Sequence, residues 1–341
     1  MGSGGGTAEA TLVEEALRVL NTADPFEKAR LGDEIATKWL KGDIEVAYDA
    51  SKEIQVPDRP ARGANVKLVS PSEMPKLGKA GSLQSRKALV HSLVHTESWA
   101  IDLSWTGTYV SVVEELIETY SDVNLEHVHK EMLPPIDDII ARFGKQEAMP
   151  RDFFTDFVKV AQDEGRHFTL LAERLKELGS FYGAFPAHDG LWDSAAATSN
   201  DLLARLAIEH CVHEARGLDV VPTTISRFRK GGDEKTAELL ETVIYPEEIT
   251  HCAAGVKWFK FLTLRKGSKE DDDSGDHTFK GDEADERADA EVIPKFHEIV
   301  RAFFRGPLKP PFNEVARKAA GFGPQWYQPL AVKDKFISHS F

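Results

Sequence analysis

The sequence predicts an all-α protein. Two observations lead to this prediction: apolar residues recur at helical spacing along most of the 341 residues, and the alternating β-branched runs typical of strands are almost absent. Apolar residues make up 41% of the chain, with 19 Phe and 6 Trp, which supplies enough material for a buried core. A globally disordered chain is therefore excluded.

Charge and cysteine content narrow the class of protein further. Lys and Arg number 42 against 56 Asp and Glu, so the formal net charge is −14. An acidic chain disfavours nucleic acid as an obligate partner, although a local basic patch stays open. The 2 Cys give no disulfide framework, and no run approaches the roughly 18 consecutive apolar residues of a membrane span. We therefore expect a cytoplasmic protein that does not enter the membrane.

The helical pattern begins near the N-terminus and is then interrupted. One-sided apolar stripes predict helices over about 8–20 and 25–40. Residues 41–82 are rich in Pro, Gly, Lys and Ser without a sustained period, which indicates an extended arm or a linker. Residues 107–147 give an ambiguous pattern.

The longest periodic segments predict four central helices, at 84–106, 150–178, 194–217 and 233–265. Gly179 is a suitable C-cap for the second of them. The third is expected to end or kink near Gly217, because Pro222 starts a new turn, and Pro246 should kink the fourth. A last helix is expected over 288–304.

The chain is accordingly divided into four parts. We predict N-terminal helices and an extended arm over 1–82, a four-helix core over 83–266, an acidic surface insertion over 267–291, and a C-terminal helix with a Pro-rich tail over 292–341.

Two matching pentapeptides carry the chemistry. Residues 163–167 read Asp-Glu-Gly-Arg-His and residues 247–251 read Glu-Glu-Ile-Thr-His, each in the middle of a predicted long helix. In a helix, Glu at i and His at i+3 lie on one face and can bind one metal ion together. The proposed ligands from these repeats are Glu164, His167, Glu248 and His251. Solvated helix faces are the alternative for each pair.

Two further acids complete a ligand set. Carboxylate-bridged di-metal bundles of the ferritin-like type add one Glu from each of two other helices. Glu97 and Glu214 are central in the first and third predicted core helices, so the chain order is Glu, Glu-x-x-His, Glu, Glu-x-x-His. Iron and manganese accept carboxylate oxygen and imidazole nitrogen, and four carboxylates neutralise two divalent ions. The predicted cofactor is therefore a pair of iron ions, with Fe/Mn and Mn/Mn as alternatives.

Other polar residues near the pentapeptides are expected to support the ligands. Asp163 and Glu247 would accept the ring N–H of the ligating histidines, and Arg166 would balance or orient one of these acids. His95 is expected to be a core histidine or a support for the ligands, and Tyr245, one turn before Glu248, a packed residue on the same face. Cys211 and Cys252 are expected to be small buried residues.

Several longer stretches resemble a known family. They are His95–Leu103, Met149–Phe154, Ala161–Phe168, Phe185–Trp192, His213–Val220 and Pro307–Asn313. In this order they are similar to the DUF455 proteins, an uncharacterised branch of the ferritin-like superfamily. The resemblance covers roughly residues 85–327 and implies a four-helix bundle with a di-metal core. Together with the helical pattern, it predicts a ferritin-like bundle with extra helices at both ends and irregular arms.

The ligand pattern favours a non-haem di-iron oxidoreductase: an O₂-dependent hydroxylase or oxidase that takes a small-molecule substrate and an electron donor. A ferroxidase or other iron-handling protein is the second hypothesis, and a scaffold without metal is the third. Fold analogy with a tRNA-modifying di-iron hydroxylase adds a further alternative. A homodimer is an open alternative to a monomer.

Overall fold

The structure, a computed structural model, describes residues 10–105 with short gaps at 50, 53–56, 58 and 77, then 148–267, 282–305 and 307–331. Within these ranges the regular elements are helices, and β pairing is limited to two isolated bridges. The all-α prediction is thus confirmed. The chain forms two compact units, one of residues 1–77 and 87–200 and the other of residues 78–86 and 201–341.

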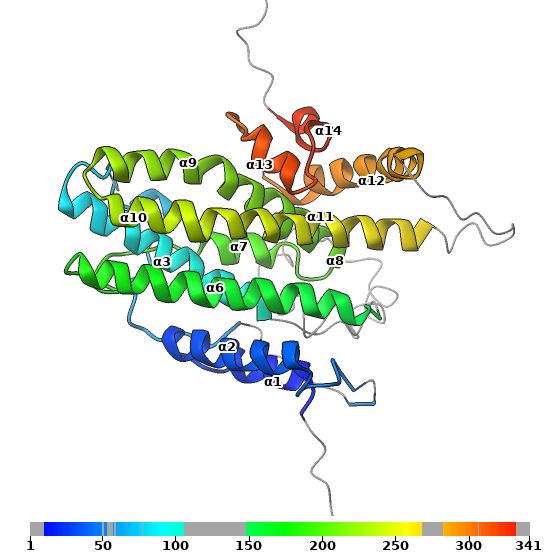
Figure 1. The fold of residues 1–341 in the computed structure, drawn as a ribbon, viewed down its shortest axis with the longest axis horizontal. Coiled ribbons are helices and arrows are strands. Elements are labelled where there is room, and N and C mark those ends of the chain that lie inside the picture. Colours follow the sequence, from blue (N-terminus) through cyan, green and yellow to red (C-terminus); the bar gives the residue numbers. More distant parts are fainter. Residues whose placement is uncertain are drawn as a thin grey trace, which may run out of the picture. The chain divides into compact units, whose positions relative to one another are not determined.

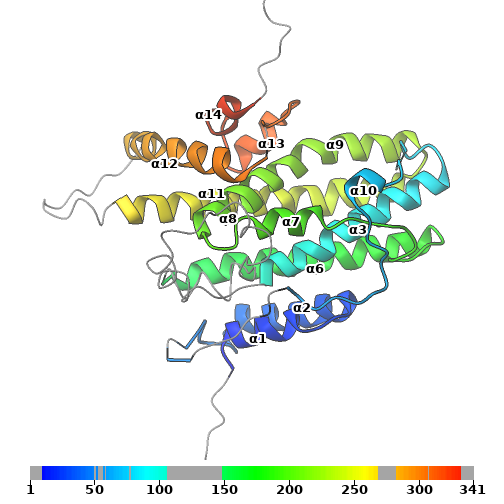
Figure 2. The same ribbon diagram turned by 180° about the vertical axis from the view of Figure 1, so that it is seen from behind.

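The first unit is built on helices α1 (Leu12–Leu20), α2 (Pro25–Lys41) and α6 (Arg151–Glu177). Figures 1 and 2 show α1 beside α2, and α2 packs along α6. Local sequence sets the helix ends, because Thr11 forms a capping box with Glu14, and Asp24 caps α2 in front of Pro25. Gly42 ends α2 with a φ of 85°, a conformation that favours glycine.

The remaining helices of this part of the chain are α3 (Leu83–Trp105) and the short α7 (Gly190–Ala196). The bounds of α3 and α6 lie within one residue of the predicted 84–106 and 150–178. The segment 107–147, whose pattern is ambiguous, lies outside the described residues.

Backbone hydrogen bonds fix the segment that precedes α3, which contains the 3-10 turn η1 (Pro71–Glu73). The amide of Ala61 donates to the carbonyl of Leu20 at 2.8 Å, and the amide of Val69 donates to the carbonyl of Ala187 at 2.9 Å. Residues 59–69 are therefore held against the end of α1 and against the loop before α7.

A buried ionic cluster lies beside α3. The carboxylate of Asp102 accepts hydrogen bonds from Lys28 and from Arg62, and the Lys28 and Asp102 side chains are 2% and 0% exposed. The Arg62 guanidinium also lies 3.4 Å from the ring centroid of Trp99. Burial lowers the pKa of Lys28, and the adjacent Asp102 carboxylate opposes that shift. One carboxylate thus compensates two cations inside the unit.

Asp102→Asn should therefore destabilise the fold strongly, because it leaves two cations without their buried counter-charge. We expect a loss of about 3–5 kcal/mol in the free energy of unfolding, measured by urea denaturation. Glu34→Gln, which removes an exposed partner of Arg30 and Lys38, is the control and should cost less than about 1 kcal/mol. Equal effects of the two substitutions would contradict this role for Asp102.

The second unit contains the third predicted core helix, and here the predicted bounds are wrong. The helix begins with α8 (Leu202–Ala207), continues through a π-helical segment η3 (Ile208–His213) and ends with α9 (Glu214–Lys230). It neither starts at 194 nor stops near Gly217, and Pro222 lies inside α9. Proline at this position removes the hydrogen bond to the carbonyl of Leu218, four residues earlier. The side-chain amide of Asn313 replaces it at 3.0 Å.

The other helices of this unit follow in chain order. They are α10 (Glu234–Leu239), the π-helical η4 (Leu240–Ile244), α11 (Tyr245–Gly267), α12 (Asp282–Phe303), α13 (Glu314–Ala319), α14 (Pro324–Tyr327) and the 3-10 turn η5 (Gln328–Leu330). Helix α11 packs against α8, α9, α12 and α13. Of the predicted acidic insertion, residues 268–281 lie outside the described ranges, and α12 already begins at Asp282.

In the part of the chain that the structure covers, no helix combines the length and the apolar character that crossing a membrane requires.

Candidate metal centre

Three of the predicted ligands meet inside the first unit and form what we call the first triad. Glu97 comes from α3, and Glu164 and His167 come from α6, one turn apart. All three are buried, with exposures of 7%, 3% and 0%. Their ligand atoms lie within 4.8 Å of one another.

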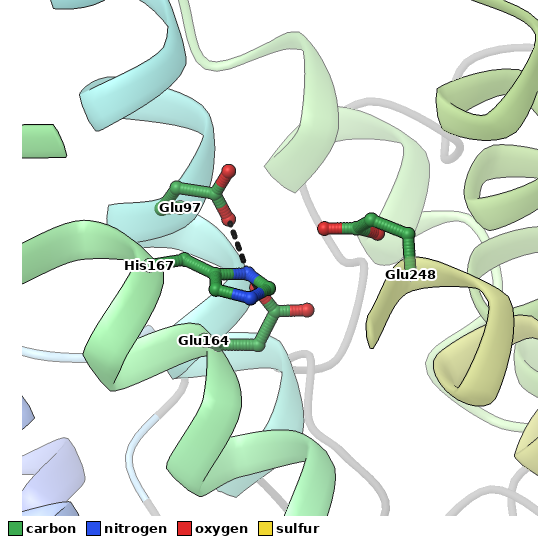
Figure 3. A group of neighbouring side chains, drawn as sticks. All are labelled: Glu97, Glu164, His167 and Glu248. Atoms are coloured by element: carbon green, nitrogen blue, oxygen red, sulfur yellow. Dashed lines mark ion pairs between the residues drawn. The ribbon is translucent and has the colours of Figure 1, made fainter. Parts of the chain in front are cut away.

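The geometry of the first triad suits a metal ion better than direct hydrogen bonding. The Nδ1 atom of His167 lies 3.6 Å from Oε2 of Glu164 and 3.9 Å from Oε2 of Glu97. Figure 3 shows the two carboxylates directed to the same edge of the imidazole; Glu248, also labelled there, belongs to the second triad. These separations exceed the roughly 3.2 Å limit of a good N–H···O bond. They fall below the roughly 4.2 Å that two metal–ligand bonds of about 2.1 Å can span.

The other three predicted ligands form a second triad inside the second unit. Glu214 is the first residue of α9, and Glu248 and His251 lie one turn apart on α11. Nδ1 of His251 lies 3.9 Å from Oε2 of Glu248, and the ligand atoms of the three residues lie within 4.8 Å of one another. The His251 side chain is fully buried and that of Glu248 is 12% exposed. Both triads therefore present a histidine Nδ1 to carboxylate oxygens.

Close helix packing positions the second triad. At Gly217, one turn after Glu214, an added Cβ would lie 4.0 Å from Oε2 of Glu248, so this carboxylate is directed toward α9. At Gly255, one turn after His251, an added Cβ would lie 2.1 Å from the carbonyl oxygen of His210. Only glycine permits α11 to approach the π-helical segment this closely. Sequence reasoning assigned neither glycine a role at the site.

The acids next to the triads lie on more open helix faces. Asp163 and Arg166 form an ion pair along α6, with side chains 23% and 43% exposed. Arg166 is thus paired with one of the two acids, and its predicted role at the metal site stays a prediction. Glu247 is half-buried. The prediction that Asp163 and Glu247 support the ligating histidines stays a prediction.

His95 and Tyr245 form hydrogen bonds with loops. The Nε2 atom of His95 lies 3.2 Å from the carbonyl of His188, and its Nδ1 lies 2.9 Å from the hydroxyl of Tyr182. Because a carbonyl only accepts, Nε2 carries the proton and Nδ1 accepts from Tyr182. Burial lowers the pKa of His95 to about 4, so the ring is neutral at pH 7. The hydroxyl of Tyr245 accepts a hydrogen bond from Asn313 at 2.6 Å.

The two cysteines are buried inside the second unit. Burial raises the pKa of Cys211 and of Cys252 well above the usual range of a thiol, and the carboxylate of Glu214 adds to both shifts. Both thiols therefore stay protonated at neutral pH in the absence of metal, which agrees with the prediction of small buried residues.

Together these observations define a class of protein: an all-α chain whose buried Glu and His side chains form groups that could hold metal ions. Carboxylate oxygen and imidazole nitrogen suit iron, manganese and other borderline-hard divalent ions.

The particular family follows from comparison with known proteins. The family model described as "Protein of unknown function (DUF455)" matches residues 21–328, so the chain belongs to the DUF455 family. An uncharacterised protein of Haemophilus influenzae is 30% identical over 260 residues, which cover 75% of this chain and 77% of the relative. No solved structure matches the chain.

Proposed function

We propose that the two triads belong to one dinuclear centre for iron or manganese. Glu97, Glu164 and His167 would hold one ion, and Glu214, Glu248 and His251 the other. The observation that carries the proposal is the repetition of one arrangement in both units, a lone Glu beside a Glu-x-x-His turn whose histidine is buried. Ferritin-like di-iron and di-manganese bundles use this set of ligands.

The charge of the donor set supports a pair of divalent ions. Gathering four carboxylates at sites with little access to solvent is costly unless positive charge compensates them. Two divalent cations supply four positive charges, which makes the complete centre neutral. A single ion would leave a net negative charge. The proposed stoichiometry of two ions per chain follows from this balance.

We further propose that the protein is a di-iron oxidoreductase, an O₂-dependent hydroxylase or oxidase that uses an external electron donor. When bound, the metal pair supplies the redox chemistry. The chain supplies two buried imidazoles and the buried carboxylates of Glu97 and Glu164, an environment that would limit the access of water to the ions. An iron-handling protein without an organic substrate would use the same ligands.

Oxygen consumption by the iron-loaded protein separates these two functions. With two Fe(II) per chain added anaerobically and no reductant, both functions predict a limited uptake of O₂ on exposure to air. With Fe(II) in large excess and still no reductant, an iron-handling protein should oxidise the whole excess, whereas a hydroxylase or oxidase should stop once the ions of its own centre are oxidised. The control Glu248→Gln should consume O₂ no faster than free Fe(II) in buffer. Turnover that persists in this variant would contradict the assignment of the centre.

A further inference from the structure

A separate cavity of about 200 Å³ lies within the second unit, between α9 and the segment around residues 304–317. Its wall contains the cations Arg216, Arg305, Lys309 and Arg317 and the aromatic rings of Phe304 and Phe312. Neither triad contributes a side chain to it. The Pro307–Asn313 stretch, which the metal centre does not use, forms part of this wall.

The cavity is positively charged, although the whole chain carries a net charge of −14. Asp219 is the one acid in its wall, and both carboxylate oxygens of Asp219 accept hydrogen bonds from Arg317, at 2.9 and 2.7 Å. This pair is almost fully buried. Arg305 and Lys309 form no ion pair with any residue in the described ranges. After Asp219 has neutralised one of the four cations, an excess of three positive charges lines the cavity.

Hydrogen bonds hold the cationic wall in place before any ligand arrives. The amide of Leu308 donates to the carbonyl of Leu330 at 3.0 Å, and Arg216 donates to the carbonyl of Lys309 at 3.2 Å. The amide of Asn313 donates to Asp219 at 2.8 Å. A wall that is already ordered loses little conformational entropy when a ligand binds.

The aromatic side chains give the cavity an apolar part. The Phe304 ring packs against His213 with centroids 5.8 Å apart, and the Phe312 ring packs against Tyr327 at 4.7 Å. Both phenylalanines are only half-buried, so part of each ring stays accessible. A flat ring of a ligand can stack on such a surface.

We propose that this cavity binds a small organic phosphate that carries a flat ring, as a nucleoside monophosphate does. Arginine guanidinium groups and a lysine ammonium group can donate charge-assisted hydrogen bonds to the oxygens of a phosphate dianion. The excess of three positive charges suits a dianion better than a neutral molecule. The phenylalanine rings account for the ring of the ligand.

Calorimetric titration of the full-length, metal-free protein tests this proposal, because no bound ion can then attract the phosphate. The probes are adenosine 5′-monophosphate, adenosine and inorganic phosphate in low-salt buffer. The monophosphate should bind at least about tenfold more tightly than either fragment, and its affinity should fall as salt is added. Absence of binding, or adenosine binding as tightly as the monophosphate, overturns the proposal. Inorganic phosphate binding equally well overturns the part played by the rings.

Matched substitutions locate the binding site. Arg305→Gln and Lys309→Gln should each weaken binding of the monophosphate by about tenfold, since each removes a charge-assisted contact from an exposed position. Arg301→Gln and Lys318→Gln, which remove exposed cations outside the cavity, should change the affinity by less than about twofold. Equal effects of the two pairs overturn the assignment. Glu248→Gln, which alters only the proposed metal centre, should leave the affinity for the monophosphate unchanged. A failure of the metal proposal would therefore leave the proposal for this cavity standing.

Discussion

His167→Ala and His251→Ala should each remove at least half of the metal that the wild-type protein retains after purification without chelator. The reason is that each imidazole is one of only three side chains proposed to hold its ion. Loss of a group that merely supports a metal ligand already weakens binding by about 10–100-fold, so loss of a ligand should weaken it at least as much. Elemental analysis of iron and manganese per chain measures the effect.

The control for this experiment is His213→Ala. His213 precedes the proposed ligand Glu214 directly in the chain but lies outside both triads. This variant should keep the metal content of the wild type, and far-ultraviolet circular dichroism should show that all three variants remain helical. If His167→Ala and His251→Ala retained as much metal as His213→Ala, the two histidines would not be ligands.

Sequence alone predicted the triads because their geometry is local. Glu164 and His167, like Glu248 and His251, are three residues apart on one helix, so helical periodicity by itself places them on one face. Helix α6 is long and strongly periodic, which is why its predicted ends are correct within one residue. Glu97 and Glu214 required the additional assumption that four helices meet, which the spacing alone does not supply.

The third core helix shows where such reasoning fails. Gly217 and Pro222 ordinarily predict the end of a helix, yet α9 continues to Lys230. The compensation comes from Asn313, which lies 91 positions after Pro222 and bonds the carbonyl that the proline leaves open. No local pattern contains that contact. The sequence contains the family stretch that ends at Asn313, but it does not reveal that Asn313 bonds to the carbonyl of Leu218.

The π-helical segments were also beyond prediction. Segment η3 ends immediately before Glu214, and η4 ends four residues before Glu248. Each wider turn shifts the face on which the following residues lie, and such segments occur frequently at functional sites. Standard helical periodicity assumes a constant 3.6 residues per turn and therefore misplaces residues across them. This explains why neither Gly217 nor Gly255 could be assigned to the packing around the second triad.

Glu164→Gln should destabilise the metal-loaded protein but not the metal-free protein. In the metal-loaded protein the substitution removes a ligand, so the melting temperature should fall. A ligand that binds only the folded chain stabilises it by RT ln(1 + [L]/Kd), about 2.7 kcal/mol at one hundred times Kd, and weaker binding forfeits part of this. Differential scanning calorimetry with Fe(II) under anaerobic conditions measures this decrease in Tm.

In the chelated protein the same substitution should leave Tm unchanged or raise it. The carboxyl oxygens of Glu97 and Glu164 lie within 4.8 Å of each other in a buried setting, so two negative charges there repel or force one group to take up a proton. Glutamine keeps the shape of glutamate and removes one of these charges.

Glu173→Gln, an exposed position on the same helix, is the control and should change stability by less than about 0.5 kcal/mol in either state. The difference between the loaded and the chelated protein distinguishes a metal site from a structural ion-pair network, because in such a network the loss of a carboxylate destabilises the protein whether or not metal is present. Equal destabilisation of the loaded and the chelated protein by Glu164→Gln would therefore exclude Glu164 as a metal ligand.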